Sequence, residues 1–272
     1  MEAHMSAGRV RVAMVRIAVT GAAGGVGTET LAALDDHEVT PITHRERDGI
    51  DSEVLDVRDV AAVEAALSGQ DVVVHLAANP SAHADWADVE DVNVSGTHNV
   101  YQAAVANNVD RVVFGSSTHV THMHNMPDST AVGETAVDPA VVRADDPPRP
   151  SSPYGISKVT GEAMGSYYAD RFDVEVVNLR IGYLQSEAEL LAHQDDSPDR
   201  ARQARALYLS HRDYRHAVRQ AVTESLSENP LTIQLVSRNA DRYHSITRAM
   251  RTLGYAPRDD SRAVLENTPG KQ

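Results

Sequence analysis

A tyrosine and a lysine four positions apart carry the clearest chemistry in this sequence. They are Tyr154 and Lys158, and residues 154–171 are expected to form a helix because no strong breaker follows Gly155. Positions i and i+4 share one helix face about 6 Å apart, so an ammonium would lie beside a phenol. A fixed cation favours the phenolate and lowers a pKa that is normally about 10. Tyr154 is therefore a candidate general base.

Chance could also bring these two side chains together, as an exposed ring and a solvated lysine. Composition favours the chemical interpretation, because only two of the 25 basic residues are lysines, Lys158 and Lys271. A chain that otherwise uses arginine has one of its two lysines at this position.

The composition indicates one acidic domain. At 272 residues the chain is long enough for one substantial core, and no run of about 18 apolar residues predicts a transmembrane helix. The absence of cysteine excludes disulfides and thiolate chemistry. With 39 acidic against 25 basic residues and a formal charge of -14, nucleic acid and anionic membranes are unfavourable partners. We expect a cytoplasmic protein. The acid-rich, lysine-poor composition is typical of halophilic organisms, although an ordinary acidic protein has the same signature.

Short apolar runs alternate with helical stretches along the chain. Strands are expected at 15–20, 39–43, 53–56, 72–76, 111–116 and 175–180, and helices at 28–34, 60–67, 88–107 and 154–171. This alternation predicts an α/β fold with a Rossmann-like, doubly wound parallel sheet.

Three regions are expected around that sheet. Residues 1–14 are interpreted as a tail and residues 15–182 as the Rossmann core. Within the core, the proline-rich stretch 119–153 is expected to form a long loop, and loops of that length are usually functional or disordered. Residues 183–272 contain expected helices at 210–226 and 245–253 and a strand at 231–236. They are interpreted as a small helical substrate-binding appendage, partly interleaved with the core, that covers the site.

A glycine turn follows the first expected strand. Gly21, Gly24 and Gly27 are spaced so that the first permits a tight turn, the second lets backbone approach a pyrophosphate, and the third lets a helix pack on a strand. The amides of the helix start, including Gly25 and Val26, would bind the phosphates. Glycine turns also occur without a ligand, but this strand-to-helix context predicts a dinucleotide site.

The end of the second expected strand indicates which dinucleotide binds. An acid there normally contacts the ribose of NAD, but this chain has His44 followed by Arg45. A carboxylate would repel a 2′-phosphate, whereas a guanidinium pairs with it, so NADP is expected in preference to NAD. If the alignment shifts by one residue, Glu46 would instead be the acid that contacts the ribose. A third interpretation is that these residues form a solvated loop with no ligand.

With these residues assembled, the chain resembles the extended short-chain dehydrogenase/reductase family over nearly all of residues 15–257. The resemblance implies that Tyr154 and Lys158 are catalytic with Ser117, and that Lys158 also holds the nicotinamide ribose. It further implies a Rossmann fold and a homo-oligomer, a dimer or tetramer. The matching segments are 20–27, 55–57, 75–78, 93–97, 116–117, 154–158 and 253–257, and the implied cofactor contacts are Asp56 and Val57 at the adenine, with Leu76, Ala77, Ala78, Asn93 and Ile181.

Within that family the segments 116–119, 180–182 and 208–213 look like those of uronate dehydrogenases and related archaeal sugar dehydrogenases, which oxidise a sugar at C1. Those members usually have asparagine at the position of Thr118. They also carry an arginine for the uronate carboxylate, and Arg202, Gln203 and Arg205 give no clean match to it. The resemblance thus implies a small aldose such as L-arabinose, oxidised to a lactone. The implied substrate contacts are Asn79, Ser117, Thr118, His119, Tyr154, Tyr183 and Arg205.

Other functions remain open from the sequence. They are a glucose 6-phosphate or uronate 1-dehydrogenase, a nucleotide-sugar epimerase or dehydratase that keeps its NAD bound, and a non-catalytic NADP sensor. Only about ninety residues follow Arg180, which is short for a nucleotide-sugar domain. His119, His122 and His124 could suggest a metal, but they lack a ligand pattern with carboxylates and are read as a polar loop, so no metal is expected. Trp86 is interpreted as a packing residue, although its position after the fourth expected strand would also let it form a wall of the pocket.

Overall fold

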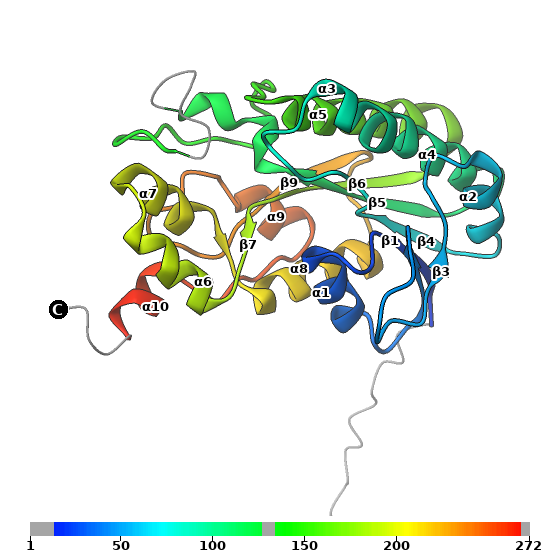
Figure 1. Ribbon diagram of the computed structural model, residues 1–272, viewed down its shortest axis with the longest axis horizontal. Coiled ribbons are helices and arrows are strands. Elements are labelled where there is room, and N and C mark those ends of the chain that lie inside the picture. Colours follow the sequence, from blue (N-terminus) through cyan, green and yellow to red (C-terminus); the bar gives the residue numbers. More distant parts are fainter. Residues whose placement is uncertain (1–13, 127–133, 268–272) are drawn as a thin grey trace, which may run out of the picture.

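The computed structural model describes residues 14–126 and 134–267. Apart from Met14, the expected tail at 1–14 lies outside the described residues, as does Lys271. The described chain contains one seven-stranded sheet in the order β3-β2-β1-β4-β5-β6-β9. Every neighbouring pair in this sheet is parallel. The expected Rossmann-like doubly wound fold is therefore confirmed (Figure 1).

The strands follow the apolar runs of the sequence closely, except that β3 ends two residues early. Beyond Val54 the carboxylate of Asp56 accepts from the backbone N–H of Arg58 at 2.9 Å, which turns the chain away from the sheet. The strands of the sheet are β1 (Arg16–Thr20), β2 (Glu38–Thr43), β3 (Glu53–Val54), β4 (Val72–His75), β5 (Arg111–Ser117), β6 (Glu175–Ile181) and β9 (Leu231–Leu235).

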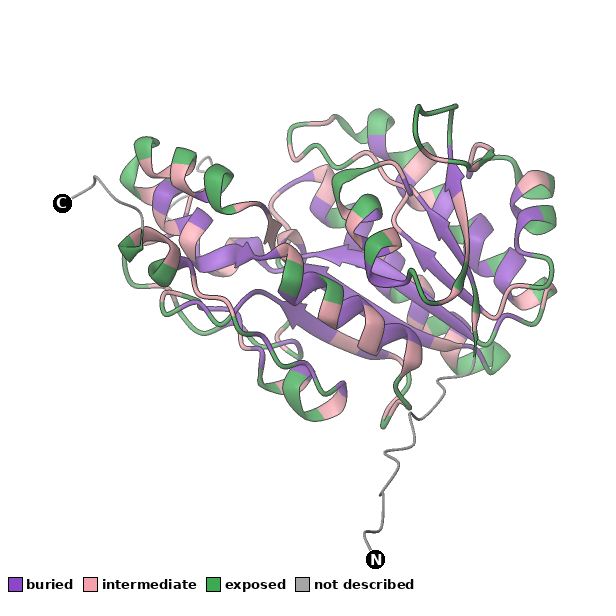
Figure 2. Cartoon of the chain, turned by 90° about the horizontal axis from the view of Figure 1, so that it is seen from below, coloured by how far each residue is buried: buried purple, intermediate pink, exposed green. Residues whose placement is uncertain are grey.

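Helices cover both faces of the sheet, because alternate side chains of each strand point to opposite sides. Ile17 and Val19 face the cluster under α1 (Gly25–Ala33) and α8 (His211–Thr223). Ala18, between them, faces the cluster under α4 (Gly96–Ala106). The two layers lie on opposite sides of the sheet in Figure 1, and burial concentrates in the strands in Figure 2. The remaining helices of these layers are α2 (Val60–Ala66), α5 (Pro153–Phe172) and α9 (Thr247–Thr252).

The expected single helix at 88–107 is wrong in detail. The chain forms α3 (Trp86–Val89), a π-helical segment (Glu90–Ser95) and then α4. The widened turn aims the amide of Asn93 at Asn79, whose backbone N–H it accepts at 2.7 Å. Single π-helical turns of this kind inside α-helices concentrate at functional sites.

The chain after residue 182 divides between the sheet and a separate lobe. The strand β9 and the helices α8 and α9 pack in the main core. The rest forms a lobe around Leu190, Ala204 and Tyr208, seen beside the sheet in Figure 1. Its elements are β7 (Tyr183–Leu184), α6 (Glu187–Ala192), α7 (Pro198–Leu207), β8 (Tyr208–Leu209) and α10 (Ser261–Glu266).

Candidate active site

The glycine turn between β1 and α1 is shaped for close backbone approach. Gly21 has φ +71°, and a Cβ there would lie 2.7 Å from the amide nitrogen of Ala77. A Cβ on Gly27 would lie 2.3 Å from the carbonyl oxygen of Gly21, so the first turn of α1 can pack on the loop only with glycine there. A Cβ on Gly25 would meet nothing within 4 Å, which leaves open space at the helix start. An anionic group fits there, against free amides and the positive end of the helix.

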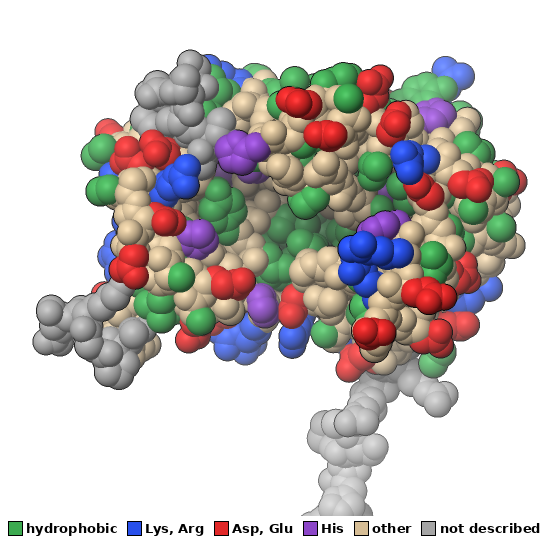
Figure 3. Space-filling model, in the orientation of Figure 1, with side chains coloured by type: hydrophobic (Ala, Val, Ile, Leu, Met, Phe, Trp, Pro, Cys, Tyr) green, Lys and Arg blue, Asp and Glu red, His purple; other side chains and the backbone are tan. Residues whose placement is uncertain are grey.

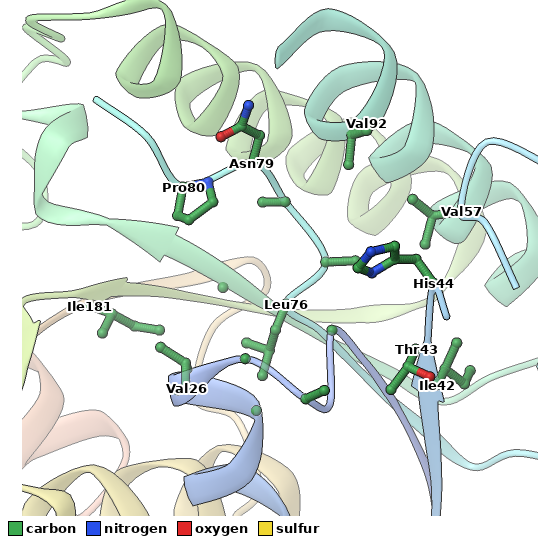
Figure 4. A pocket seen from close by; sticks show the side chains of 18 of the residues that line it. Val26, Ile42, Thr43, His44, Val57, Leu76, Asn79, Pro80, Val92 and Ile181 are labelled. Carbon is green, nitrogen blue, oxygen red and sulfur yellow. The ribbon is translucent and has the colours of Figure 1, made fainter. Parts of the chain in front are cut away.

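A cavity of about 600 Å³ extends from this turn along the carboxyl ends of the strands. Its size is typical of ligand sites, and its crevice position is where open α/β sheets bind ligands. Figure 4 shows His44 near Val57 at one end and Ile181 with Pro80 at the other, and Figure 3 shows a hollow with hydrophobic side chains and basic groups on one rim. The cavity is lined by expected cofactor residues Gly21, Gly24, Gly25, Val26, Gly27, His44, Asp56, Val57, Leu76, Ala77, Ala78, Lys158 and Ile181, together with Asn79, Ser117 and Tyr154.

Ser117, Tyr154 and Lys158 meet at the Ile181 end of the cavity. The helix α5 begins at Pro153, where the Ser152 hydroxyl accepts from the backbone N–H of Gly155 at 3.1 Å. This cap fixes Tyr154 in the first turn, where its phenol hydrogen-bonds with Ser117. The ammonium of Lys158 lies 5.6 Å from the centroid of the Tyr154 ring. It donates to the carbonyl of Gly115 at 2.7 Å.

The electrostatics of this group differ from the sequence expectation. Burial raises the pKa of Tyr154, and the hydrogen bond from Ser117 opposes that rise only in part. Burial lowers the pKa of Lys158 to about 8, while the charge of Glu162 pulls it upward. The expectation that Lys158 lowers the pKa of Tyr154 is thus corrected: desolvation dominates, and the ammonium faces the Gly115 carbonyl rather than the phenol oxygen.

The basic groups at the adenosine end also differ from expectation. His44 lines the cavity as expected, but Arg45 does not, and Arg47 and Arg58 do. Arg58 is bound through Nε and Nη2 to the carboxylate of Asp56 at 2.6–3.0 Å. Arg47 makes no ion pair with the described residues, so its guanidinium is available. Arg45 is exposed outside the cavity lining. Glu46, the alternative that the sequence left open, does not line the cavity either, whereas Arg47, two positions beyond Arg45, does.

Asn93 supports the cavity wall without lining it. Besides accepting from Asn79, its amide donates to the Asn79 carbonyl at 3.0 Å and to the Ser157 hydroxyl at 3.0 Å. His75 is buried nearby between Thr20 and Thr97, with hydrogen bonds of 2.7 Å and 3.0 Å. These contacts hold the segment after β4 against α5.

A chain of polar side chains continues from Tyr154 into the C-terminal lobe. The ring of His119 packs edge-on against Tyr154 at 5.5 Å between centroids, and His122 packs against His119 at 4.9 Å. Gln203 donates to Nε2 of His122 at 2.6 Å and accepts from the Tyr183 hydroxyl at 2.6 Å. An amide nitrogen can only donate, so His122 carries its proton on Nδ1, toward the Ser151 hydroxyl.

Several expected substrate residues therefore lie behind the cavity surface rather than on it. Thr118 is buried, and neither it, His119 nor Tyr183 lines the cavity. Arg205 points elsewhere: its guanidinium binds Asp241 at 3.1 Å and Gln194 at 2.8 Å. In the sequence, Gln203 is notable only because it does not match the arginine expected to bind a uronate carboxylate. Its position as a neutral polar residue in an arginine-rich helix is the signal that could have identified it as part of the site.

Two secondary expectations concern residues outside this group. Trp86, read as a packing residue, is 44% exposed at the start of α3. Within the described ranges, no cluster of three His, Cys, Asp or Glu side chains could hold a metal ion. None of the helices described is both long and apolar enough to cross a membrane.

The parallel sheet, the glycine turn and the Ser117, Tyr154 and Lys158 group define a class of nucleotide-binding oxidoreductases and isomerases. Residues 17–204 match the NAD dependent epimerase/dehydratase family, and the chain belongs to that family. The resemblance to extended short-chain dehydrogenases is thereby confirmed.

Particular relatives narrow the comparison. A Haloferax volcanii protein, L-arabinose 1-dehydrogenase (NAD(P)(+)), is 53% identical over 254 residues, which are 93% of this chain and 100% of that protein. NAD-dependent glucose-6-phosphate dehydrogenase of the same organism is 33% identical over 90% of this chain and 94% of its own. The crystal structure of uronate dehydrogenase from Agrobacterium tumefaciens has a TM-score of 0.73 at 26% identity, covering 95% and 91% of the two chains. A mutant of that enzyme has been solved complexed with NAD.

Proposed function

We propose that this protein is an NAD(P)-dependent sugar 1-dehydrogenase that oxidises a small neutral aldose such as L-arabinose to its lactone. One observation carries the proposal: Ser117, Tyr154 and Lys158 converge at one end of a cavity whose wall is the glycine turn. The 53% identity to an L-arabinose 1-dehydrogenase over nearly the whole chain supports the choice of sugar.

The proposed mechanism assigns one role to each of the three residues. Tyr154 removes the proton of the anomeric hydroxyl, Ser117 orients the sugar oxygen by hydrogen bonding, and Lys158 supplies positive charge beside the phenolate. A bound nicotinamide supplies the hydride acceptor. The burial that raises the pKa of Tyr154 means that the resting phenol is protonated. The phenol must therefore release its own proton to solvent before it can accept the proton of the anomeric hydroxyl.

The arginines of α7 support a neutral substrate. A phosphate or carboxylate needs a cation to replace its hydration, and a free guanidinium would supply one. Arg202 is held by Asp199 at 2.6 Å and by the Thr135 carbonyl at 2.5 Å. Arg205 is held by Asp241, and the more exposed Arg200 lies 4.0 Å from Glu134. With these groups engaged, an uncharged sugar fits the lobe better than a uronate or a sugar phosphate.

The adenosine end supports a preference for NADP. Arg47 and His44 line the cavity there, and the charge of Asp56 is already matched by Arg58. We assign to the cofactor the expected residues that line the cavity, with Asn93 behind them. Arg47 replaces Arg45 as the residue proposed to contact the 2′-phosphate. Asn79 and His119 are proposed to contact the sugar, with Thr118 and Tyr183 supporting them. Residues 183–272 contribute the lobe over the sugar.

We further propose a cytoplasmic, salt-adapted homo-oligomer, a dimer or tetramer. The formal charge of -14 with only two lysines supports salt adaptation. Exposed Tyr167 and Phe172 on α5 support a covered apolar face. Light scattering at low and high salt tests both points, and a monomer at both salt levels would overturn the oligomer.

The absorbance of reduced cofactor at 340 nm tests the function directly. Purified protein is assayed with L-arabinose, glucose 6-phosphate and glucuronate, each with NAD and with NADP. We expect turnover of the neutral aldose, faster with NADP, and little or none of the two charged sugars. Turnover of no free sugar with either cofactor would overturn the dehydrogenase assignment.

A further inference from the structure

A buried ion pair lies one helical turn beyond Lys158. It joins Glu162 on α5 to Arg180 on β6, whose side chains are 11% and 4% exposed. The guanidinium donates through Nε and Nη2 to the two carboxylate oxygens, each at 2.8 Å. Its Nη1 donates to the Ala144 carbonyl at 3.1 Å. Because desolvation of a buried pair offsets much of its attraction, stability by itself is a weak explanation for it.

The same carboxylate reaches the strand that carries Ser117. Ser116, its neighbour on β5, donates its hydroxyl to Oε1 of Glu162 at 2.6 Å. The helix lies very close to that strand, since a Cβ on Gly161 would be 2.3 Å from the Phe114 ring. Glu162 therefore links α5, which carries the tyrosine and the lysine, to β5 and β6 at once.

Glu162 also sets the charge around Lys158. The ammonium is buried against the Phe114 ring and the Gly115 carbonyl of β5. Nearby His75 on β4 supplies no negative charge, because burial and Lys158 lower its pKa to about 3. Among the described residues, the titratable and charged groups that face Lys158 are Tyr154 and Glu162 on α5, His75 on β4 and, behind Glu162, Arg180 on β6.

We infer that Glu162 is a positioning residue that acts through Lys158: its carboxylate keeps the buried ammonium charged and, with Ser116 and Arg180, fixes the catalytic helix against the strand of Ser117. The effect on turnover rests on the proposed function, whereas the effect on Lys158 itself does not. Burial acting alone would discharge the lysine at lower pH, and a phenolate beside a neutral amine would lose its stabilising cation.

The composition of the chain gives a direct measurement. With only Lys158 and Lys271 present, protein labelled with ¹³C,¹⁵N-lysine gives two side-chain signals, which a Lys271→Arg variant assigns. We expect Lys158 to titrate near the value of about 8 in wild type. In Glu162→Gln it should titrate about one to three units lower, since an opposite charge one helical turn away is removed. Lys271 serves as the internal reference in every sample.

A matched control exists on the same two strands. Arg111 on β5 pairs with Glu175 on β6 at the opposite end of their register, and Arg111 also donates to the carbonyls of Ala221 and Val222. Glu175→Gln removes an Arg–Glu pair between the same two strands, with a carboxylate that is 42% exposed, far from the lysine. It should therefore leave the Lys158 titration unchanged. Equal shifts in the two variants would overturn the inference.

Two further variants keep the test decisive. Glu162→Asp retains the charge and should titrate closer to wild type than Glu162→Gln. If Glu162→Gln does not fold because Arg180 is left unpaired, the double variant Glu162→Gln with Arg180→Gln removes that unpaired guanidinium. Its Lys158 should also titrate below wild type, because Glu162 and not Arg180 is the charge acting on the lysine. An unchanged Lys158 pKa in the double variant would overturn the inference.

The pH profile of kcat/KM provides the kinetic readout. Turnover requires charged Lys158, so the alkaline limb should move to lower pH in Glu162→Gln and stay in place in Glu175→Gln. If wild type oxidises no sugar while Lys158 titrates as expected, the proposed function fails and the inference stands. If wild type is active and the alkaline limbs of the wild-type and Glu162→Gln profiles coincide, the inference is wrong.

Discussion

The two ends of the cavity solve recognition in opposite ways. At the adenosine end His44 and Arg47 line an open surface, and the basic charge is available to a ligand. At the sugar end the charges are either engaged or absent. Arg205 is bound by Asp241, and burial lowers the pKa of His119 to about 3 and that of His122 to about 4. Under the proposed function, charge selects the cofactor, whereas neutral hydrogen bonding and shape select the sugar.

The largest effect is expected at the sugar end from Tyr154→Phe. Losing a general base typically costs about 10²- to 10⁴-fold in rate, and kcat should fall by that factor. Because the phenyl ring still fills its place beside His119, the dissociation constant of the cofactor, measured by fluorescence titration, should change less than about threefold. Wild-type turnover in this variant would show that the sugar end works without the phenol.

A pH titration of stability sharpens the same contrast. His119, His122 and His244 are buried neutral, with pKa values lowered by burial to about 3, 4 and 3. In the unfolded chain they bind protons below about pH 6.5, so the unfolded state holds more protons between about pH 6.5 and 4. The free energy of unfolding should therefore fall as pH decreases through this window, by up to about 1.4 kcal/mol per unit for each histidine.

Urea denaturation at pH 7 and pH 5 measures this loss, and His122→Asn isolates it. Buried His75 contributes to the same loss, since its pKa is also lowered to about 3. Removing one titrating histidine should nevertheless make the stability curve shallower in that window. Equal pH dependence in the variant and the wild type would mean that His122 is charged in the folded protein, and the sugar end would no longer be neutral.

At the adenosine end, Arg47→Ala should weaken NADP selectively. A charge-assisted hydrogen bond to a 2′-phosphate contributes about 1.5–3 kcal/mol, so KM for NADP should rise at least about tenfold while KM for NAD stays within about twofold. Arg45→Ala is the matched control, since this side chain does not line the cavity. Equal losses for the two cofactors would remove Arg47 from phosphate recognition.

The smallest effect is expected from Arg205→Ala. Its partly exposed pair with Asp241 contributes about 0–1 kcal/mol, and the melting temperature should fall by only a few degrees. Oxidation of the neutral sugar should keep kcat/KM within about threefold. A tenfold loss confined to KM for the sugar would mean that this guanidinium turns toward the substrate, and the contrast between the two ends would fail.

How much could be predicted differs between these regions. Strands buried on both faces show as apolar runs, and the glycines show because backbone geometry at Gly21 and Gly27 excludes any other side chain. Those are local demands, which a sequence records directly. Other features depend on the direction in which a loop or a widened turn points a side chain. Examples are the presence of Arg47 rather than Arg45 in the cavity lining and the π-helical turn that contains Asn93. Spacing along the chain carries little information about that direction.

The sequence by itself determined the parallel α/β architecture, the dinucleotide turn and the pairing of Tyr154 with Lys158, because each follows from a short-range period or from a backbone requirement. Only the tertiary structure decided the electrostatics of that pair. Packing of β5 against α5 desolvates Lys158 and lowers its pKa, and Ser116 of β5 and Arg180 of β6 hold the Glu162 carboxylate one helical turn from the lysine. The strength of these charge interactions depends on the distance between the groups and on the low dielectric constant of the interior. Both are established only when the chain folds.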